Sequence, residues 1–374
     1  MNVEREIGGF ALPFTAGVLI TAYAGLSFCM YSSLVHHLGF TLILTAICGL
    51  LIKRHQRSYL CTWGLISLGA TGCGILSAAT GISLNLEMPL SALEALAYEF
   101  GTRMQSAIDS IPFDSADTGA LVKALLTGER DSLPGDIIQS FRDSGASHIL
   151  ALSGLHLGII YMLFSKILGV LGNSILGRRC RSCLTILSCG FYTMATGAGP
   201  SITRAFLFIV LGEAARLSGR YRSLSQLLFS SLILHLTVSP LSIRSVSFQL
   251  SYAAMAGIAF IFPWLKGFWP DSHKGESIAG RTLSRAMQWI WVSAALSISC
   301  QLTTAPLAYM YFGTIPTHFI LTNLIALPLI GILIPAAVLT LCLIAAGCCP
   351  GFVIQLTEAV ADLLSWSLKV IATM

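Results

Sequence analysis

The sequence predicts an all-α fold, a polytopic bundle of about eleven transmembrane helices with short external amphipathic helices. The chain is 55% hydrophobic and 10% charged, with a mean hydropathy of +0.78, whereas roughly a quarter of an ordinary soluble domain is charged. Apolar stretches of about 20 residues, the length that crosses a bilayer core, recur along it. Lysine and arginine gather in alternate connections between these stretches. These observations exclude an aqueous globular fold.

The expected spans fall into two groups separated by a more polar segment. An N-terminal unit at 1–83 holds spans near 10–30, 37–52 and 59–82, and an external segment follows at 84–146. A transmembrane core at 147–374 holds eight further spans, near 147–172, 183–199, 201–217, 223–239, 246–265, 287–312, 318–347 and 353–373.

The basic residues give the expected orientation. The cluster Lys53, Arg54 and Arg57 and the connection 266–285 fall on one side of the membrane if the spans alternate. The positive-inside rule makes that side the cytoplasm. The N-terminus is therefore predicted to be cytoplasmic and segment 84–146 external, and the net charge of +5 reflects topology rather than nucleic-acid binding.

The external segment is expected to contain three amphipathic helices. Apolar residues recur every three or four positions from Leu93 to Ile111, which predicts a helix on the outer leaflet or against the bundle. A second helix is expected to begin at Asp117 as its N-cap and to end near Gly128, and a third follows Pro134. Together they would form a collar leading into the fourth span.

The stretch FRDSGASHILALSGLHLGII, residues 141–160, places polar groups at the mouth of that span. His148 and His156 are eight residues apart and would share one side of a continuous helix. Gly154 and Gly158 form a small-xxx-small pair that would let another helix approach. Two interpretations stay open: tight packing with the histidines bonded to carbonyls, or a broken or water-lined helix at the entrance of a pathway.

Other polar residues interrupt later spans. Arg204, in GAGPSITRAF, would either snorkel to the outer interface or face an anionic substrate. The amides of Gln249 and Gln301 must face protein or water. Helix breaks are expected at Pro306 and at Pro328, the latter near Asn323. Such breaks suit a transport pathway, and interhelical hydrogen bonding without transport is the alternative.

Motifs for chemistry are sparse. The ALSG at 151–154 resembles the nucleophile motif of rhomboid intramembrane proteases, with Ser153 as nucleophile and His235 or His318 as base. Asp362 is expected to be isolated, and Cys180-x-x-Cys183 lacks a second ligand pair. We therefore predict no metal site and no cofactor.

Five blocks, taken in order, carry a family resemblance. They are GER at 128–130, FRDSGASHILALSGLHLG at 141–158, GPSITRA at 199–205, SVSFQLS at 245–251, and QLTTAPL with FGTIPTHFILTNLIALPL between 301 and 329. Over about 115–374 the chain resembles the competence domain of the ComEC family, inner-membrane channels that carry single-stranded DNA into the cytoplasm during natural transformation. Larger members add an external OB-like domain and a C-terminal metallo-β-lactamase-like domain. Neither is expected here, and without an H-x-H-x-D-H motif the resemblance implies a channel rather than a nuclease.

The resemblance implies a substrate pathway with three parts. Arg142 and His148 would act at an external vestibule, Ser153 and His156 at a helix break, and Arg204, Gln249, Gln301 and Asn323 along the lumen. Their expected work is hydrogen bonding and charge neutralisation, without chemistry on the substrate.

The expected partners are single-stranded DNA, a DNA receptor, a cytoplasmic helicase or ATPase and the lipid membrane. A separate nuclease and self-association stay open. The alternatives in function are an intramembrane serine hydrolase and a transporter for a small solute.

Overall fold

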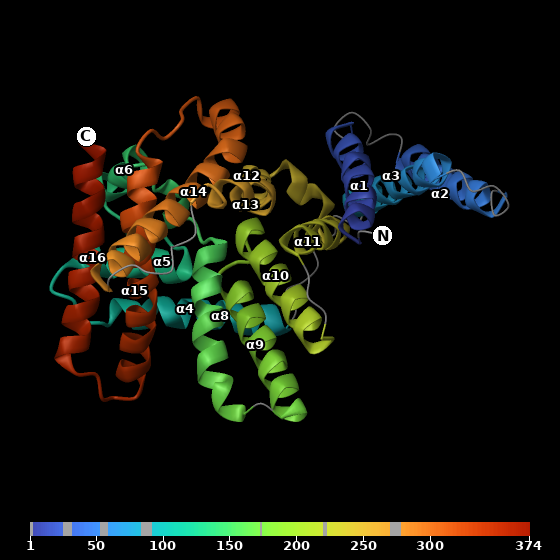
Figure 1. Ribbon diagram of the computed structural model, residues 1–374. Helices are drawn as coiled ribbons and strands as arrows, with labels where there is room; N and C mark the ends of the chain where they lie inside the picture. The colour runs from blue at the N-terminus through green and yellow to red at the C-terminus, as the bar shows by residue number, and fades with distance from the viewer. Residues whose placement is uncertain are drawn as a thin grey trace. The chain divides into compact units, whose positions relative to one another are not determined.

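The computed structural model describes residues 3–24, 32–52, 59–83, 92–172, 174–219, 223–269 and 278–374. These residues form helices and no strand occurs among them, which confirms the all-α prediction (Figure 1). The predicted basic cluster Lys53, Arg54 and Arg57, and part of the basic connection at 270–277, lie outside the described residues.

The chain divides into two compact units. Unit 1 comprises Met1–Pro89 and Leu207–Ala259, and unit 2 comprises Leu90–Phe206 and Phe260–Met374. The helices described in unit 1 are α1 (Val3–Ala24), α2 (Ser32–Ile52), α3 (Tyr59–Ser83), α11 (Leu224–Val238) and α12 (Val246–Ala256). Those of unit 2 are α4 (Ala92–Asp109), α5 (Ala116–Thr127), α6 (Gly135–Asp143), α7 (Ser147–Leu150), α8 (Gly154–Ile167), α9 (Ile175–Ala195), α13 (Phe262–Lys266), α14 (Ile278–Phe312), α15 (Phe319–Ala345) and α16 (Gly351–Ala372). Helix α10 (Pro200–Leu217) contributes its first seven residues to unit 2 and the remainder to unit 1.

Glycines set the packing of unit 1. A methyl group on Gly17 of α1 would lie 2.2 Å from the carbonyl oxygen of Thr71, and one on Gly74 of α3 would lie 2.1 Å from that of Phe14. The backbones of α1 and α3 therefore touch, as small residues allow in membrane helices.

Six described helical regions are long and apolar enough to cross a bilayer. They are Glu6–Tyr23, Thr62–Thr80, Gly154–Leu171, Val246–Lys266, Thr282–Phe312 and Phe319–Ala345. Val35–Cys48 and Leu224–Val238 are shorter apolar helices. The molecule is thus a membrane protein, while the count of about eleven spans stays a prediction.

The predicted breaks at Pro306 and Pro328 are wrong. Helix α14 runs through Pro306 to Phe312, and α15 runs through both Pro328 and Pro335. A proline removes one backbone hydrogen bond, but a long apolar helix in a membrane keeps all its others and has no better conformation available.

The segment 84–146, predicted to be external, supplies α4, α5 and α6. A methyl group on Gly101 of α4 would lie 2.4 Å from the carbonyl oxygen of Ala195, so α4 packs directly on the end of α9. Leu93, Leu96 and Phe100 are exposed on α4. This exposed apolar stripe fits the amphipathic helix that the spacing predicts.

The N-terminus of α5 is capped by distant carboxylates. The predicted N-cap, Asp117, is wrong: it lies inside the first turn, and Ser115 occupies the cap position. The backbone N–H of Ser115 donates to Glu358 Oε1 at 2.8 Å, and the Thr118 hydroxyl donates to Asp362 Oδ1 at 3.2 Å. Asp362 is therefore not isolated, because α16 carries these carboxylates to the positive end of α5.

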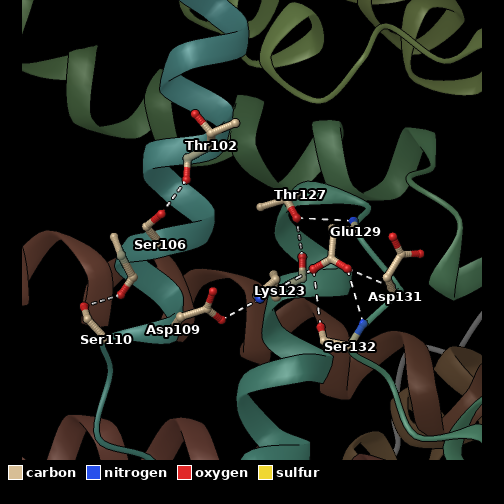
Figure 2. Close-up of polar contacts among 10 residues, drawn as sticks. Thr102, Ser106, Asp109, Ser110, Lys123, Thr127, Glu129, Asp131 and Ser132 are labelled. Atoms are coloured by element: carbon tan, nitrogen blue, oxygen red, sulfur yellow. Dashed lines mark hydrogen bonds and ion pairs between the residues drawn. The ribbon is translucent and has the colours of Figure 1, made fainter.

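Lys123 ties α4 to α5 and to the loop that follows it (Figure 2). Its Nζ lies 2.5 Å from Asp109 Oδ1 and 3.5 Å from Glu129 Oε2. The hydrogen bond to Asp109 raises the pKa of Lys123 above its ordinary value. Glu129 Oε1 also accepts the N–H of Asp131 at 2.7 Å, so this loop is held in place beside α5.

Candidate substrate pathway

The helix at the mouth of the predicted fourth span is broken. Helix α7 ends at Leu150 and α8 begins at Gly154, with Ser153 as its N-cap in an extended conformation. Ser153 Oγ accepts the N–H of Leu155 at 3.3 Å, and His156 Nδ1 accepts the N–H of Ser153 at 3.3 Å. This is a capping box in which histidine takes the place of glutamate. The broken helix, one of the two interpretations of this stretch, is therefore present, and it divides the predicted span 147–172 between α7 and α8.

His156 is buried behind this cap. Its side chain is 1% exposed and its Nδ1 also lies 3.0 Å from Ser153 Oγ. Since Nδ1 accepts a backbone N–H, the neutral ring carries its proton on Nε2. Within the described residues, buried Nε2 has no hydrogen-bond partner. A buried donor in this state favours a bound water or ligand beside it.

Arg204 lies next to the start of α8. It is 8% exposed, in the second turn of α10. A methyl group on Gly154 would lie 3.1 Å from an Arg204 guanidinium nitrogen. The positive charge of Arg204 also interacts electrostatically with the thiol of Cys300 on α14. Arg204 therefore faces protein, which disfavours snorkelling and favours the interpretation of a cation inside the bundle.

Asn323 brings α14 and α15 to the same place. Its Nδ2 donates to Ser297 Oγ at 3.2 Å, and its side chain interacts with the ring of His148. His148 donates from Nδ1 to the Gly145 carbonyl at 3.2 Å. The Asn323 Oδ1 is buried and, in the described part of the chain, has no hydrogen-bond partner.

We call the polar cluster the set His148, Ser153, His156, Arg204 and Asn323 of unit 2. All five were predicted from the sequence, but a helix break separates His148 from His156, so the two histidines do not share one side of a continuous helix.

The loop that carries His148 is fixed by residues that sequence analysis missed. The Thr322 hydroxyl donates to the Ser144 carbonyl at 2.6 Å. Gly145, with φ +82°, lies so close to Pro316 that a methyl group would come within 2.7 Å. Both partners belong to the block FGTIPTHFILTN, so the resemblance was the signal that could have singled them out.

A second glycine, in the block GER at 128–130, brings that block close to the junction between α7 and α8. Gly128, with φ +81°, leaves room for Leu152, which a methyl group would approach to 2.7 Å. Four of the five blocks thus meet where α7 ends and α8 begins.

The remaining predicted site residues lie elsewhere. Arg142 is exposed in the last turn of α6, and Gln301 lines a cavity on α14. Gln249 belongs to unit 1, where its Nε2 donates to the Ile243 carbonyl at 2.9 Å. The close approach predicted at Gly158 is wrong, since nothing lies within 4 Å of a methyl group placed there.

Over the described ranges, histidine, cysteine, aspartate and glutamate form no group of three or more that could hold a metal ion. The polar cluster offers hydrogen-bonding groups and a positive charge inside an apolar bundle.

Comparison with known proteins gives one family and several relatives. The family model described as "Competence protein" matches residues 125–374. ComE operon protein 3 of Bacillus subtilis (strain 168) is 34% identical over 138 residues, which is 37% of this chain and 17% of that protein. The uncharacterized protein YcaI of Escherichia coli (strain K12) is 25% identical over 240 residues, 63% of this chain and 30% of that protein.

An uncharacterized protein of Aquifex aeolicus (strain VF5) is 28% identical over 214 residues, 56% of this chain and 45% of that protein. These matches span less than half the length of each relative. No solved structure matches. Because the family model covers about two thirds of its residues, the chain belongs to the competence protein family.

Proposed function

We propose that this protein is an inner-membrane channel that carries single-stranded DNA into the cytoplasm during natural transformation, with the N-terminus in the cytoplasm. The family supports a role in DNA uptake. The observation that carries the proposal is the buried Arg204 beside the break between α7 and α8, with an unsatisfied donor on His156. A buried cation and donors suit a passing phosphodiester, which is anionic and accepts hydrogen bonds.

The eight predicted pathway residues then take different roles. The polar cluster contacts the strand at the mouth of α8, Arg142 draws it toward the mouth, and Gln301 lines the path along α14. Gln249, which belongs to unit 1, stays a predicted pathway residue. A DNA receptor, a cytoplasmic helicase or ATPase and, for the complementary strand, a separate nuclease are the partners that such a channel needs.

Uptake into vesicles tests the proposal. The full chain is reconstituted in proteoliposomes loaded with a single-strand-binding protein, so that an entering strand is retained without a motor. Labelled DNA that resists external nuclease is then counted. We expect Arg204→Gln to lower uptake at least about tenfold, the size of one lost charge-assisted contact. The matched control is Arg103→Gln, which removes an exposed arginine paired only on the surface with Glu99.

His156 needs a variant that keeps the helix cap. Glutamine at this position supplies the acceptor that a capping box requires, so His156→Gln removes the ring and its buried donor while α8 still starts at Gly154. We expect reduced uptake with unchanged folding. If Arg204→Gln and His156→Gln are folded and transport normally, the polar cluster does not line the path.

An intramembrane serine hydrolase is the second candidate. The 3.0 Å separation of Ser153 Oγ and His156 Nδ1 favours it, with His156 in the place of the predicted bases His235 and His318. However, both atoms already serve the cap of α8. Labelling of Ser153 by a fluorophosphonate probe, lost in Ser153→Ala, would support the hydrolase over the channel.

A further inference from the structure

Helices α8 and α9 form a hairpin (Figure 1), and the 3₁₀ helix η2 (Leu168–Leu171) lies between them in the chain and contacts both. Four basic residues lie at this turn, Lys166 at the end of α8 and Arg178, Arg179 and Arg181 in the first two turns of α9. We call these four residues the basic turn. The candidate span Gly154–Leu171, of 18 residues, separates it from the polar cluster. That length corresponds to a helical rise of about 27 Å, close to the thickness of a bilayer core.

The start of α9 is fixed by a tight connection. Ser174 is the N-cap, and its Oγ accepts the N–H of Gly177 at 3.0 Å. A methyl group on Gly177 would lie 2.3 Å from the carbonyl oxygen of Leu171, so the backbones of α9 and η2 touch. Arg178 and Arg181 are three residues apart on α9 and therefore lie on the same side of the helix. The connection thus holds these two charges close together at one end of the hairpin.

The chain does not compensate the charge of the basic turn. The sequence has no aspartate or glutamate between Asp143 and Glu213. Among the residues that the structure describes, none of the four basic side chains forms a salt bridge. The Nε of Arg181 is buried and, over the same ranges, has no hydrogen-bond partner. The first turn of α9 holds no acidic residue, so the positive end of the helix adds to these charges. The basic turn therefore favours an anion from outside the chain.

Exposed aliphatic side chains surround the basic turn. Val170 is 92% exposed, Leu176 is 72% exposed and Ile175 is 65% exposed. Aliphatic side chains exposed beside basic ones are typical of a segment in the membrane interface, where acyl chains cover the former and headgroups bind the latter. No phenylalanine, tyrosine, tryptophan or histidine occurs between residues 165 and 185. A surface for single-stranded nucleic acid would use such rings for stacking, so the pattern favours a lipid.

We propose that the basic turn is a binding site for the headgroup of an anionic phospholipid. The lipid phosphate accepts charge-assisted hydrogen bonds from Arg178 and Arg181, and its acyl chains lie against exposed aliphatic side chains of α9 such as Leu184 and Leu187. Lys166 adds to the attraction from the end of α8. With segment 84–146 external, as proposed above, the lipid belongs to the cytoplasmic leaflet. The site concerns the membrane and does not depend on DNA transport.

Retention of two phospholipids by the purified full chain tests the site. Phosphatidylglycerol is anionic, whereas phosphatidylcholine with the same acyl chains has the same phosphate but no net charge. Native mass spectrometry of the protein in a neutral detergent measures how many molecules retain each lipid. We expect the native protein to retain phosphatidylglycerol at least about tenfold better, because each of two arginines near an anionic headgroup contributes about fivefold.

Variants at the basic turn should remove this preference. Arg178→Gln and Arg181→Gln are each expected to reduce it about fivefold, and the double variant should retain the two lipids nearly alike. Lysine at both positions keeps the charge and should keep most of the preference. The matched control is Arg103→Gln, which removes an exposed arginine of α4 and should change nothing. The unfolding temperature in the same detergent shows whether each variant is folded.

The outcomes distinguish a lipid from other anions. Equal retention of both lipids by the native protein would overturn the site, and so would a preference that survives in the folded double variant. Displacement of phosphatidylglycerol by an equal concentration of oligothymidylate or inorganic phosphate would assign the arginines to a soluble anion and overturn it too. A phosphatidylglycerol with a diazirine below its headgroup should label a peptide containing Leu184 or Leu187, and labelling only elsewhere would contradict the assignment. Failure of the lipid site would leave the proposed DNA channel standing.

Discussion

Replacing Thr322 by valine should loosen the loop that positions His148. Thr322 and Ser144 are both fully buried, and the Thr322 hydroxyl donates to the Ser144 carbonyl at 2.6 Å. Valine keeps the shape but removes the donor. Side-chain hydrogen bonds in membrane proteins average about 0.6 kcal/mol and reach about 1.7. A buried carbonyl that loses this partner adds a desolvation cost, so we expect a loss of roughly 1–2 kcal/mol.

Thermal unfolding of the purified full chain in detergent measures this loss. A shift of roughly 2–4 °C per kcal/mol is expected for a cooperative unit of this size. Thr322→Ser retains the hydroxyl and should behave almost as the native protein does. The control is Thr15→Val, which removes a bond to Ala11 within a single turn of α1. If Thr322→Val unfolds no earlier than Thr15→Val, the bond between α15 and the loop does not hold the junction.

Three further variants test the packing of unit 2. Lys123→Met should lower stability at neutral pH. Because the pKa of Lys123 is raised in the folded state, its contribution to stability is fully present below the ordinary pKa of 10.5 and disappears as the pH rises through the folded-state pKa. Thermal unfolding of the native protein and the variant against pH measures this contribution, and a difference in stability that persists at high pH would contradict the pairing of Lys123 with Asp109. Gly101→Val should separate α4 from Ala195 and expose segment 84–146 to protease, whereas equal protease resistance in the native protein and the variant would rule out the close contact. Glu358→Gln should cost about 1 kcal/mol, because the carboxylate that accepts the Ser115 N–H at the start of α5 loses its charge, and an unchanged unfolding temperature would show that this cap is unimportant.

Hydropathy predicted the helices well because each long helix satisfies its own backbone in an apolar run. Hydropathy could not place the first and last residues of individual helices. A break near Ser153 was among the interpretations of the sequence, but the start of α8 at Gly154 depends on a capping box whose fourth residue is histidine, a residue that the usual motif does not include. The opposite error occurred at Pro306 and Pro328, where proline signals a helix end in water but not inside a long membrane helix.

The candidate site was predicted in part for similar reasons. Polar residues in apolar runs stand out in a sequence, which is why the members of the polar cluster could be selected. Their mutual contacts could not be predicted, since Asn323 meets His148 only when residues 175 positions apart fold together. Thr322 gave no signal by itself, because a threonine in a membrane helix more often bonds to its own preceding turn, as Thr15 does.

The most direct test of the pathway is to trap a strand in transit. A single-stranded DNA with a bulky protein block at its trailing end is drawn into proteoliposomes and stalled. A photoreactive amino acid is placed at His148 in one protein and at Leu187, which is exposed on the apolar surface of α9, in another. The account predicts crosslinks to the stalled strand from position 148 and none from position 187. Crosslinks from 187 alone, or equal crosslinks from both, would contradict a path through the junction of α7 and α8.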